Sequence, residues 1–373
     1  MPRNYRVAVI GHTGRGNYGH GLDTVWQAFD NVQIMAVADA DPKGRAAAQQ
    51  RLKAKSAYAD YRQMLQKERP QIVSVATRFL DEHRDMVVAC AEAGASIFLE
   101  KPMCRTLAEA DEMVAACERH HVKLAIAHQT RYSPRLTRVR ELVADGLIGD
   151  VLEMRARGKE DNRAGGQDLM VLGTHLMDLM RFLCGDARWC YARAAVVDKD
   201  RVRPATKADV REGGEGMGPI VGDHITALYG FDNGVVGHFA STKCTRGKNE
   251  NDRFGLAVQG TRGIVQLTTG SLPPVYYLND PSWFPGRGKT PWQPITSAGL
   301  GKPETIKEGG LGQGNIWIVR DLMEAIEKDR QPRGSLYDGR AALEMILAVY
   351  ESHRLRTSVD LPLKNRRHPL AVG

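Results

Sequence analysis

The chain has 373 residues, of which 42% are hydrophobic, and it carries a formal net charge of +8. This length and apolar content suffice for two domains, each with its own core. The basic residues are scattered apart from the tail KNRRHP at 364–369. Such scatter is typical of a solvated surface, so we expect no nucleic-acid partner.

The N-terminal residues MPRNYRVAVIGHTG enter a strand-like run without the sections of a signal peptide, and no apolar run reaches the roughly 18 residues of a membrane helix. We therefore expect a cytoplasmic protein with no membrane partner. The six cysteines form no Cys-x-x-Cys pair and lie mostly in apolar runs. This favours buried reduced thiols, and we expect no metal site.

The first third alternates short apolar runs with amphipathic segments. Such runs are typical of parallel strands covered on both faces, and they lie at 5–10, 34–38, 72–76, 96–99 and 122–127. Between the last two, Thr106 and Glu109 predict a capping box at the start of a helix. Gly94 is placed to end the preceding helix. The alternation predicts an α/β domain with a doubly wound parallel sheet over residues 1–128.

Residues 129–373 show a different pattern. We expect a helix at 133–146, a strand at 151–157 and a long helix from Asp168 to Cys184, closed by Gly185. Apolar runs with antiparallel signals follow, and Asn233-Gly234 between two of them predicts a tight hairpin. Helices at 315–328 and 338–354 complete an α+β domain with a large, mostly antiparallel open sheet.

Two segments, 199–219 and 281–314, fit neither pattern and are rich in glycine. Loops of this length inside a compact domain are usually functional or disordered. In the second segment, Trp283, Phe284 and Trp292 favour contacts with a sugar or with another subunit.

The first strand ends in GHTGRG. A glycine turn before a helix directs backbone N–H groups and the helix dipole at a pyrophosphate. Thr13 stands where the second glycine of G-x-G-x-x-G is expected, and Gly14 beside it would restore the clearance. A flexible glycine loop is the alternative. The candidate cofactor-binding residues are Gly11, His12, Thr13, Gly14, Arg15 and Gly16.

Asp39 ends the second predicted strand. An acid at this position accepts hydrogen bonds from the ribose hydroxyls of a dinucleotide. Its charge would repel the additional phosphate of NADP, so we expect NAD as the cofactor. The alternative is an ordinary turn residue before Asp41-Pro42.

The stretch FLEKPM at 98–103 places Lys101 at the carboxyl edge of the predicted parallel sheet, where ligands bind. Hydride transfer from a secondary alcohol requires removal of the hydroxyl proton, and Lys101 is our candidate for that base. A close pair with Glu100 would oppose loss of the lysine proton, so we expect Glu100 to point toward the cofactor or a neighbouring loop. Pro102 is a candidate to follow a cis peptide.

The motifs VSVATRFLDEH, EKP, HQTRYSP and LGTHLMDLMRFL, in this order, resemble the Gfo/Idh/MocA family of oxidoreductases over nearly the whole chain. The resemblance implies an N-terminal Rossmann domain, a C-terminal domain that binds substrate and forms oligomers through its open sheet, and NAD(P)-dependent chemistry on sugars or polyols. It implies that Lys101 and His175 are catalytic and that Thr77, Glu100 and Lys101 contact the cofactor. We expect a homodimer or homotetramer.

His175 lies beside an apolar stripe of its helix, where a core histidine is the alternative, but its position after GGQDLMVLG favours a place in the cleft between the domains. Many family members carry an aspartate four residues earlier, where this chain has Val171. Asp168, also a candidate substrate contact, or Asp178 would then orient the imidazole. By resemblance, Arg131 and Tyr132 bind substrate hydroxyls or else tie the two domains together.

The sequence thus predicts an NAD-dependent dehydrogenase of a sugar, glycoside or cyclic polyol, in which Lys101 handles the proton and His175 positions the same hydroxyl. One alternative is a redox-neutral enzyme that retains NAD and cleaves a glycosidic bond by transient oxidation. The other is a non-catalytic sensor of sugar or NAD, a reading that Val171 keeps open.

Overall fold

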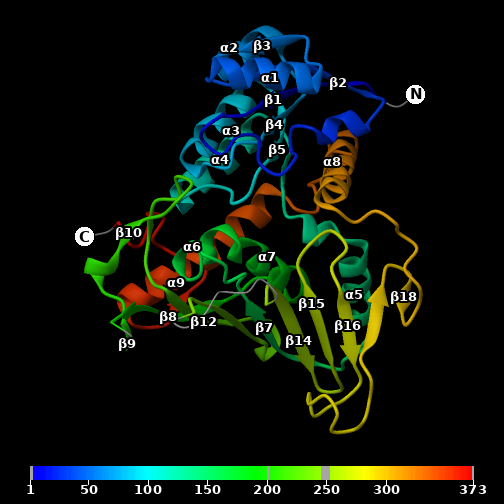
Figure 1. Ribbon diagram of the computed structural model, residues 1–373, viewed down its shortest axis with the longest axis vertical. Helices are drawn as coiled ribbons and strands as arrows, with labels where there is room; N and C mark the ends of the chain where they lie inside the picture. Colours follow the sequence, from blue (N-terminus) through cyan, green and yellow to red (C-terminus); the bar gives the residue numbers. More distant parts are fainter. Residues whose placement is uncertain (1–2, 200, 245–252, 372–373) are drawn as a thin grey trace. The chain divides into compact units, whose positions relative to one another are not determined.

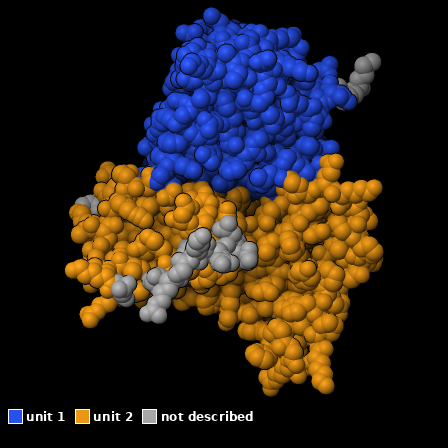
Figure 2. Space-filling model, in the orientation of Figure 1, with its two compact units in different colours: residues 1–129, 214–218, 311–340 blue, residues 130–213, 219–310, 341–373 orange. Residues whose placement is uncertain are grey.

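The computed structural model describes residues 3–199, 201–244 and 253–371 and divides into two compact units (Figures 1 and 2). The first unit comprises Met1–Gln129, Gly214–Gly218 and Leu311–Arg340, and the second comprises Thr130–Gly213, Pro219–Gly310 and Ala341–Gly373. Residues from the C-terminal part of the chain, which include a long helix, therefore belong to the first unit. The functional division at residue 128 remains a prediction.

The first unit is built around a parallel sheet in the order β3-β2-β1-β4-β5-β6. The doubly wound sheet predicted from the apolar runs is confirmed, and the short strand β3, which no such run indicated, is added at its edge. The strand order reverses between β1 and β4, the point at which ligands bind in such sheets. The strands are β1 Tyr5–Ile10, β2 Val32–Ala38, β3 Ser56–Tyr58, β4 Ile72–Val75, β5 Ser96–Leu99 and β6 Leu124–Ile126.

Helices cover both faces of this sheet (Figure 1). Helices α3 and α4 pack against each other on one face, and α8 packs with the short helix η1 on the other. The helical elements are η1 Val25–Ala28, α1 Pro42–Leu52, α2 Tyr61–Glu68, η2 Leu80–Glu82, α3 His83–Glu92, α4 Leu107–Arg119 and α8 Leu311–Glu327.

Helix α4 begins as predicted at Thr106, whose hydroxyl accepts the N–H of Glu109. The second half of the predicted capping box is wrong. The Glu109 carboxylate accepts the N–H of Arg105 instead of that of Thr106, because the Arg105 guanidinium also binds it. Gly94 follows α3 with φ of +74° and ends that helix as expected.

The segment after β1 departs from the prediction. Between β1 and β2, a stretch that the structure describes completely, residues 13–24 form turns apart from Asn17, which forms a β-bridge with His12, and η1 is the only helical element. Gly14, Gly16, Gly19 and Gly21 all have positive φ, a conformation that an α-helix does not accommodate. No helix dipole therefore starts at the glycine loop.

The second unit contains a large sheet in the order β18-β17-β16-β15-β14-β7-β13-β12-β8-β19, with β9 paired to β8. The pairs along it are antiparallel apart from β7 with β13, so the predicted mostly antiparallel sheet is confirmed. The strands are β7 Val151–Arg157, β8 Trp189–Asp198, β9 Arg201–Pro204, β12 His224–Gly230, β13 Val236–Thr242, β14 Gly255–Gly260, β15 Ile264–Thr268, β16 Val275–Leu278, β17 Gln293–Thr296, β18 Gly299–Leu300 and β19 Val359–Asp360.

The register gives this sheet one buried face and one open face. Neighbouring residues in a strand point to opposite faces. A row of paired residues that is buried throughout crosses the sheet at Ala192, Ala227, Phe239, Ala156, Leu256, Leu267 and Val275. One position along, the row that defines the open face consists of Tyr191, Leu228, His238, Arg155, Ala257, Gln266 and Tyr276.

Helices α5 Pro134–Ala144, α6 Gly166–Val171 and α7 Gly173–Cys184 contact the sheet, and most of α9 Leu336–Leu355 also belongs to the second unit. The long helix predicted from Asp168 is interrupted at Leu172, and Gly173, a weak helix former, starts the second piece. Gly185 ends α7 with φ of +79°, as predicted. The predicted hairpin joins β12 to β13 through Asn233 and Gly234, both of which have positive φ.

The two segments predicted as loops contain regular structure. The described part of 199–219 includes β9, the turn η4 Lys207–Asp209 and the strand β10 Arg211–Glu212, which pairs with β11 Pro219–Ile220. Segment 281–314 includes β17, β18 and the start of α8. These short strands contain charged residues and prolines and have no apolar run, so the sequence analysis did not predict them. Trp283 donates to the carbonyl of Gly260, whereas Phe284 is 66% exposed.

None of the helices in the described residues has the length and hydropathy to cross a bilayer. Cys90, Cys104, Cys117 and Cys190 are buried, and Cys184 and Cys244 are half-buried. Burial raises the pKa of Cys117 to about 12, so this thiol stays protonated and unreactive.

Candidate active site

The predicted cofactor residues of the first unit lie at one edge of its sheet. The loop 11–16 follows β1, Asp39 follows β2, Thr77 comes shortly after β4, and Glu100 and Lys101 follow β5. These strands are parallel neighbours around the reversal of strand order. The carboxyl ends of parallel strands share one edge, so the structure brings these residues together where a dinucleotide binds in this architecture.

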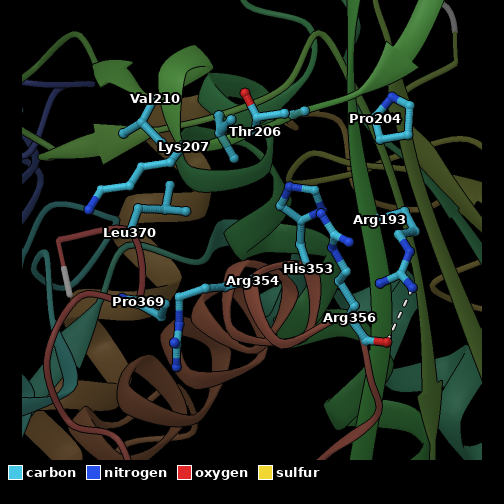
Figure 3. A pocket seen from close by; sticks show the side chains of 12 residues that line it. Arg193, Pro204, Thr206, Lys207, Val210, His353, Arg354, Arg356, Pro369 and Leu370 are labelled. Atoms are coloured by element: carbon cyan, nitrogen blue, oxygen red, sulfur yellow. Dashed lines mark hydrogen bonds between the residues drawn. The ribbon is translucent and has the colours of Figure 1, made fainter. Parts of the chain in front are cut away.

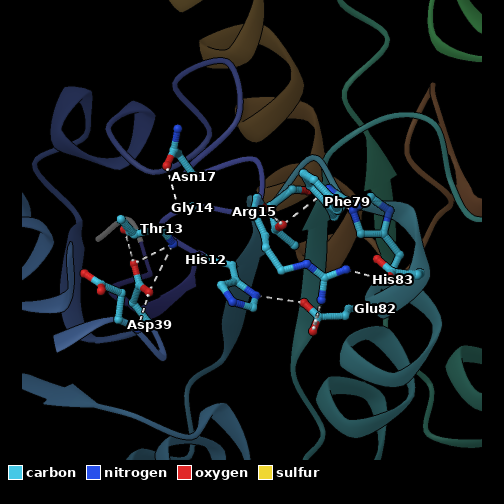
Figure 4. A network of polar contacts seen from close by, with 12 residues as sticks. His12, Thr13, Gly14, Arg15, Asn17, Asp39, Phe79, Glu82 and His83 are labelled. Carbon is cyan, nitrogen blue, oxygen red and sulfur yellow. Dashed lines mark hydrogen bonds and ion pairs between the residues drawn. The ribbon is translucent and has the colours of Figure 1, made fainter. Parts of the chain in front are cut away.

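The Asp39 carboxylate ties the glycine loop to β2 (Figure 4). It accepts the N–H of Thr13 at 3.1 Å, the hydroxyls of Thr13 at 2.7 Å and Tyr18 at 2.8 Å, and the N–H of Asp41 at 3.0 Å. Burial and the bond to Asp39 raise the pKa of Tyr18 far above its usual value, so Tyr18 remains a donor. A carboxylate has about four lone-pair sites. A ribose would therefore have to exchange with one of these partners.

The loop N–H groups are also bound within the protein. Those of His12, Gly14 and Arg15 donate to Asn17 or to the His12 carbonyl. This differs from the expected row of N–H groups directed at a pyrophosphate. Clearance is present, however, because a side chain added at Gly14 would meet nothing within 4 Å. The binding of a phosphate at this loop remains a prediction.

Two acids of η2 hold the basic side chains of the loop (Figure 4). Arg15 pairs with Asp81 at 2.5 Å and Glu82 at 3.2 Å, and His12 lies 3.0 Å from Glu82. Thr77 completes the arrangement by donating its hydroxyl to the Arg15 carbonyl at 2.9 Å. Nothing in the local sequence of Asp81 and Glu82 indicated this role, because their partners come from a distant loop.

Glu100 and Lys101 form the other end of this edge. The fully buried Glu100 places Oε1 3.0 Å from Nδ1 of His20 and 3.9 Å from Nζ of Lys101. Glu100 points toward His20 in a neighbouring loop, as expected. The expectation that Glu100 stays apart from Lys101 is wrong. Its Oε2 is buried without a hydrogen-bond partner. The peptide between Lys101 and Pro102 is cis, as predicted.

The pKa of Glu100 lies below the usual value of a glutamate. Burial alone would raise this pKa, but the hydrogen bond with His20 and the positive charge of Lys101 together outweigh the burial. Glu100 is therefore ionised at neutral pH, and its orphaned Oε2 is an acceptor that fits a donor group of a bound cofactor.

His83, which the sequence reasoning did not single out, joins the two strand ends. The fully buried ring lies 2.8 Å from the carbonyl of Thr77 through Nε2 and 3.1 Å from the carbonyls of Pro102 and Met103 through Nδ1. This histidine therefore fixes the segment after β4 to the segment that carries Lys101.

In the second unit, the Asp168 carboxylate is fully buried and anchors a loop. It accepts the hydroxyl of Ser241 at 2.5 Å and the N–H groups of Lys159 at 3.3 Å and Glu160 at 3.1 Å. Burial raises the pKa of Asp168, and these hydrogen bonds offset the shift only in part. The proposed role of Asp168 toward substrate or imidazole remains a prediction.

Arg131 and Asp178 form a buried ion pair within the second unit. Nε and Nη2 of Arg131 lie 2.9 Å and 2.7 Å from Asp178, and the guanidinium stacks on the ring of Phe182. This geometry favours a structural role for Arg131. The neighbouring Tyr132 is 2% exposed.

The half-buried ring of His175 contacts Phe254 edge to face at 6.3 Å between ring centres. Val171, at the position of the family aspartate, is 2% exposed. Lys101 and His175 belong to different units, so the meeting of these two side chains at one substrate remains a prediction.

A cavity of about 460 Å³ lies elsewhere in the second unit (Figure 3). Arg193, Lys207, His353 and Arg356 contribute to its lining, together with apolar residues. Burial and the charge of Arg193 lower the pKa of His353, which is neutral there. No predicted site residue lines this cavity. Among the residues that the structure describes, no cluster of three or more potential ligands for a metal ion occurs.

Comparison with known proteins gives relatives that match from about half to nearly all of the chain. Levoglucosan dehydrogenase of Pseudarthrobacter phenanthrenivorans is 26% identical over 96% of this chain and 99% of its own. D-apiose dehydrogenase of Paraburkholderia graminis is 34% identical over 49% of this chain and 51% of its own. Myo-inositol 2-dehydrogenase of Thermotoga maritima is 23% identical over 62% and 71% of the respective chains.

Solved structures have the same fold. Levoglucosan dehydrogenase in complex with NADH and levoglucosan aligns with a TM-score of 0.76 at 22% identity, covering 97% of this chain and 100% of that one. An oxidoreductase from Agrobacterium radiobacter in complex with NAD⁺, L-tartaric acid and magnesium aligns with a TM-score of 0.72 at 19% identity, covering 96% and 98%.

Two family models match consecutive parts of the chain. Residues 5–128 match the NAD-binding Rossmann fold of the oxidoreductase family GFO_IDH_MocA, and residues 136–266 match the GFO/IDH/MocA C-terminal domain. Together with the parallel sheet of the first unit and the open sheet of the second, these matches confirm the resemblance seen in the motifs. The chain belongs to the Gfo/Idh/MocA family of oxidoreductases.

Proposed function

We propose that this protein is an NAD-dependent dehydrogenase that oxidises a secondary alcohol of a sugar, glycoside or cyclic polyol. The observation that carries the proposal is Lys101, which is 7% exposed at the carboxyl edge of the dinucleotide-type sheet and lies next to an ionised, buried Glu100. The relatives are named as dehydrogenases of levoglucosan, apiose and inositol, and these names support the proposed substrate class.

The residues at this edge fit a dinucleotide. The open space at Gly14 suits a pyrophosphate, and the orphaned Oε2 of Glu100 suits a donor at the other end of the cofactor. NAD supplies the acceptor for the substrate hydride. We propose NAD over NADP because Asp39 places a negative charge at the end of β2, where it would repel an additional phosphate.

Lys101 takes the hydroxyl proton of the substrate as the carbon loses its hydride, because the developing carbonyl cannot keep that proton. His175 positions the same hydroxyl. Val171 supplies no carboxylate, and the ionised Glu100 lies 3.9 Å from the lysine nitrogen. Assembly into a homodimer or homotetramer through the open face is a further part of the proposal.

Replacing Lys101 by Met tests the function. We expect the Lys101→Met variant to bind NAD like the wild type and to lose roughly 100-fold or more in kcat with any sugar that the wild type oxidises, since acid–base catalysis contributes about that much. NADH absorbance measures turnover, and fluorescence titration measures NAD binding.

The matched control for this test is Lys123→Met. Lys123 also pairs with a carboxylate, that of Asp329 at 2.7 Å, but it precedes β6 at the opposite edge of the sheet. Full activity of the Lys101 variant would contradict the proposed mechanism. Bound NAD in the purified protein with turnover of a glycoside but no net NADH would favour transient oxidation, and sugar binding without turnover would favour a sensor.

A further inference from the structure

The outer edge of β8 in the second unit is paired with strands at both ends and with side chains in the middle. Strand β19 pairs with its start and β9 with its end. In the gap, the N–H of Ala192 donates to the Ser352 hydroxyl of α9 at 2.8 Å. The N–H of Ala194 donates to Nδ1 of His353 at 3.2 Å. Side chains of α9 thus satisfy the strand edge, which leaves space between β19 and β9.

The cavity of about 460 Å³ borders this gap (Figure 3). Its lining comes from β8, the segment 204–210, the end of α9 and the tail at 369–370, all in the second unit. The apolar part of the lining consists of Pro204, Ala205, Val210, Val221, Pro369 and Leu370. This volume lies within the range of about 300–1,000 Å³ that small-molecule sites occupy.

The basic side chains of the cavity exceed the acids available to neutralise them. Arg354 is paired with Glu351 at 2.9 Å. Asp209, in the turn that borders the cavity, is held by Arg203 through two bonds of 2.7 Å. The lining residues that form no ion pair with any described residue are Arg193, Lys207 and Arg356. The cavity therefore has an excess of positive charge.

The guanidinium of Arg193 is oriented by groups that leave its charge in place. It donates to the carbonyl of Arg356 at 3.2 Å and to that of Ala192 at 3.4 Å (Figure 3). It also lies over the ring of Tyr191, 5.0 Å from the ring centre. A guanidinium has five N–H donors, so these contacts leave donors for a ligand.

A second guanidinium lies near the first. Burial lowers the pKa of His353, and the charges of Arg193 and Arg356 lower it further, so both charges lie close to this imidazole. Two like charges that share one environment repel each other. An anion bound between them would remove this repulsion.

We propose that this cavity binds a small organic anion that consists of a phosphate or carboxylate head and an apolar body. The head accepts hydrogen bonds from Arg193 and Arg356, whose planar forks match both kinds of anion, and it lies within the field of Lys207. The body packs on the apolar part of the lining. This site lies outside the proposed dehydrogenase chemistry and does not rest on it.

The apolar lining argues against a sugar as the occupant, because hydroxyl groups buried against it would lose their hydrogen bonds to water. Inorganic phosphate would satisfy the guanidinium groups but would leave the apolar part of the lining in contact with water. Both the head and the body are therefore required for tight binding.

The first test is calorimetric titration of the full chain at constant ionic strength with phenyl phosphate, phenylacetate, benzyl alcohol and inorganic phosphate. At least one of the first two should bind about tenfold or more tightly than benzyl alcohol and inorganic phosphate, since each of the latter lacks one half of the ligand. The order of phenyl phosphate and phenylacetate identifies the preferred head. Equal affinity for the aromatic anions and either partial probe would overturn the proposal.

The second test assigns the binding to this cavity. Arg193→Met, Arg356→Met and Lys207→Met each remove one charge, and we expect the two arginine variants to bind the better aromatic anion about tenfold or more weakly. The matched control is Arg188→Met, because Arg188 precedes β8 and pairs with Asp232 on the exposed surface. This control should keep wild-type affinity.

Thermal unfolding without ligand shows whether each variant folds. The side chains of Arg356 and Lys207 are exposed, so their variants decide the question even where Arg193→Met is unstable. Wild-type affinity in both folded variants would overturn the site. Loss of affinity in Arg188→Met equal to that in Arg356→Met would show attraction by general surface charge and would overturn it as well.

Discussion

At the scale of single residues, Asp39 does two things at once: its charge stands at the end of β2, and its oxygens hold the loop. Under our proposal that this charge disfavours the additional phosphate of NADP, we expect Asp39→Asn to reduce the preference for NAD over NADP by roughly tenfold or more. The measurement is the ratio of kcat/KM for the two cofactors with one sugar.

Tyr18→Phe is the matched control for Asp39. It removes one donor from the carboxylate, at 2.8 Å, and leaves the charge in place. The cofactor preference should therefore stay as in the wild type, while the free energy of unfolding falls by roughly 1 kcal/mol. A change of preference in Tyr18→Phe equal to that in Asp39→Asn would show that loop anchoring, and not charge, selects the cofactor.

At the scale of elements, β13 is joined to α6 through Ser241. Its hydroxyl donates to Asp168 and accepts the N–H of Gly165 at 2.9 Å, and all of these groups are buried. Ser241→Ala leaves an N–H group and a carboxylate oxygen without this partner, so we expect the free energy of unfolding at neutral pH to fall by roughly 1–3 kcal/mol. Urea unfolding measures it, with Thr226→Ala on the exposed surface of β12 as the control.

The same pair gives a pH dependence. Burial raises the pKa of Asp168 in the folded state above its unfolded value of about 3.9. Between these two pKa values the folded state binds more protons, so stability falls as pH rises through this window. The hydrogen bond from Ser241 lowers the pKa of Asp168 in the folded state. The loss of unfolding free energy in Ser241→Ala should therefore be smaller at a pH at which Asp168 is protonated. An equal cost at acidic and neutral pH would contradict this account.

The local sequence predicted an element well where one pattern of apolar residues continues through the whole element. The continuous apolar runs placed β1, β2, β4, β5 and β6 correctly, because strands covered on both faces need no alternation. The prediction of a helix directly after β1 failed, because the glycines there favour turns. The prediction of one long helix from Asp168 failed, because Leu172 interrupts an otherwise continuous helical pattern.

The candidate site shows the same limit. The sequence placed Lys101, Glu100 and Asp39 at the sheet edge because each follows an apolar run. It did not find His20 as the partner of Glu100, because 80 positions separate them and only the fold brings them together. The Gly19-His20-Gly21 stretch was the available signal, since glycines on both sides of a histidine indicate a backbone shaped around that side chain.

At the scale of the whole molecule, the open face of the large sheet is the surface through which we expect the protein to assemble. Tyr191 is 38% exposed and Tyr276 46% exposed at the two ends of the paired row, with Leu228 between them. A row that combines aromatic and aliphatic side chains with His238, Arg155 and Gln266 across many strands suits a large self-complementary interface.

A charge in this row should break the assembly. Leu228→Glu places a carboxylate on the open face beside Tyr191, toward one end of the row, and sedimentation should then show the monomer mass in place of the dimer or tetramer mass. Leu311→Glu, which alters an exposed leucine at the start of α8 in the first unit, should leave the mass unchanged. An oligomer that persists in Leu228→Glu but dissociates in Leu311→Glu would show that the interface does not lie on the sheet. A wild type that sediments as a monomer would contradict the proposed assembly.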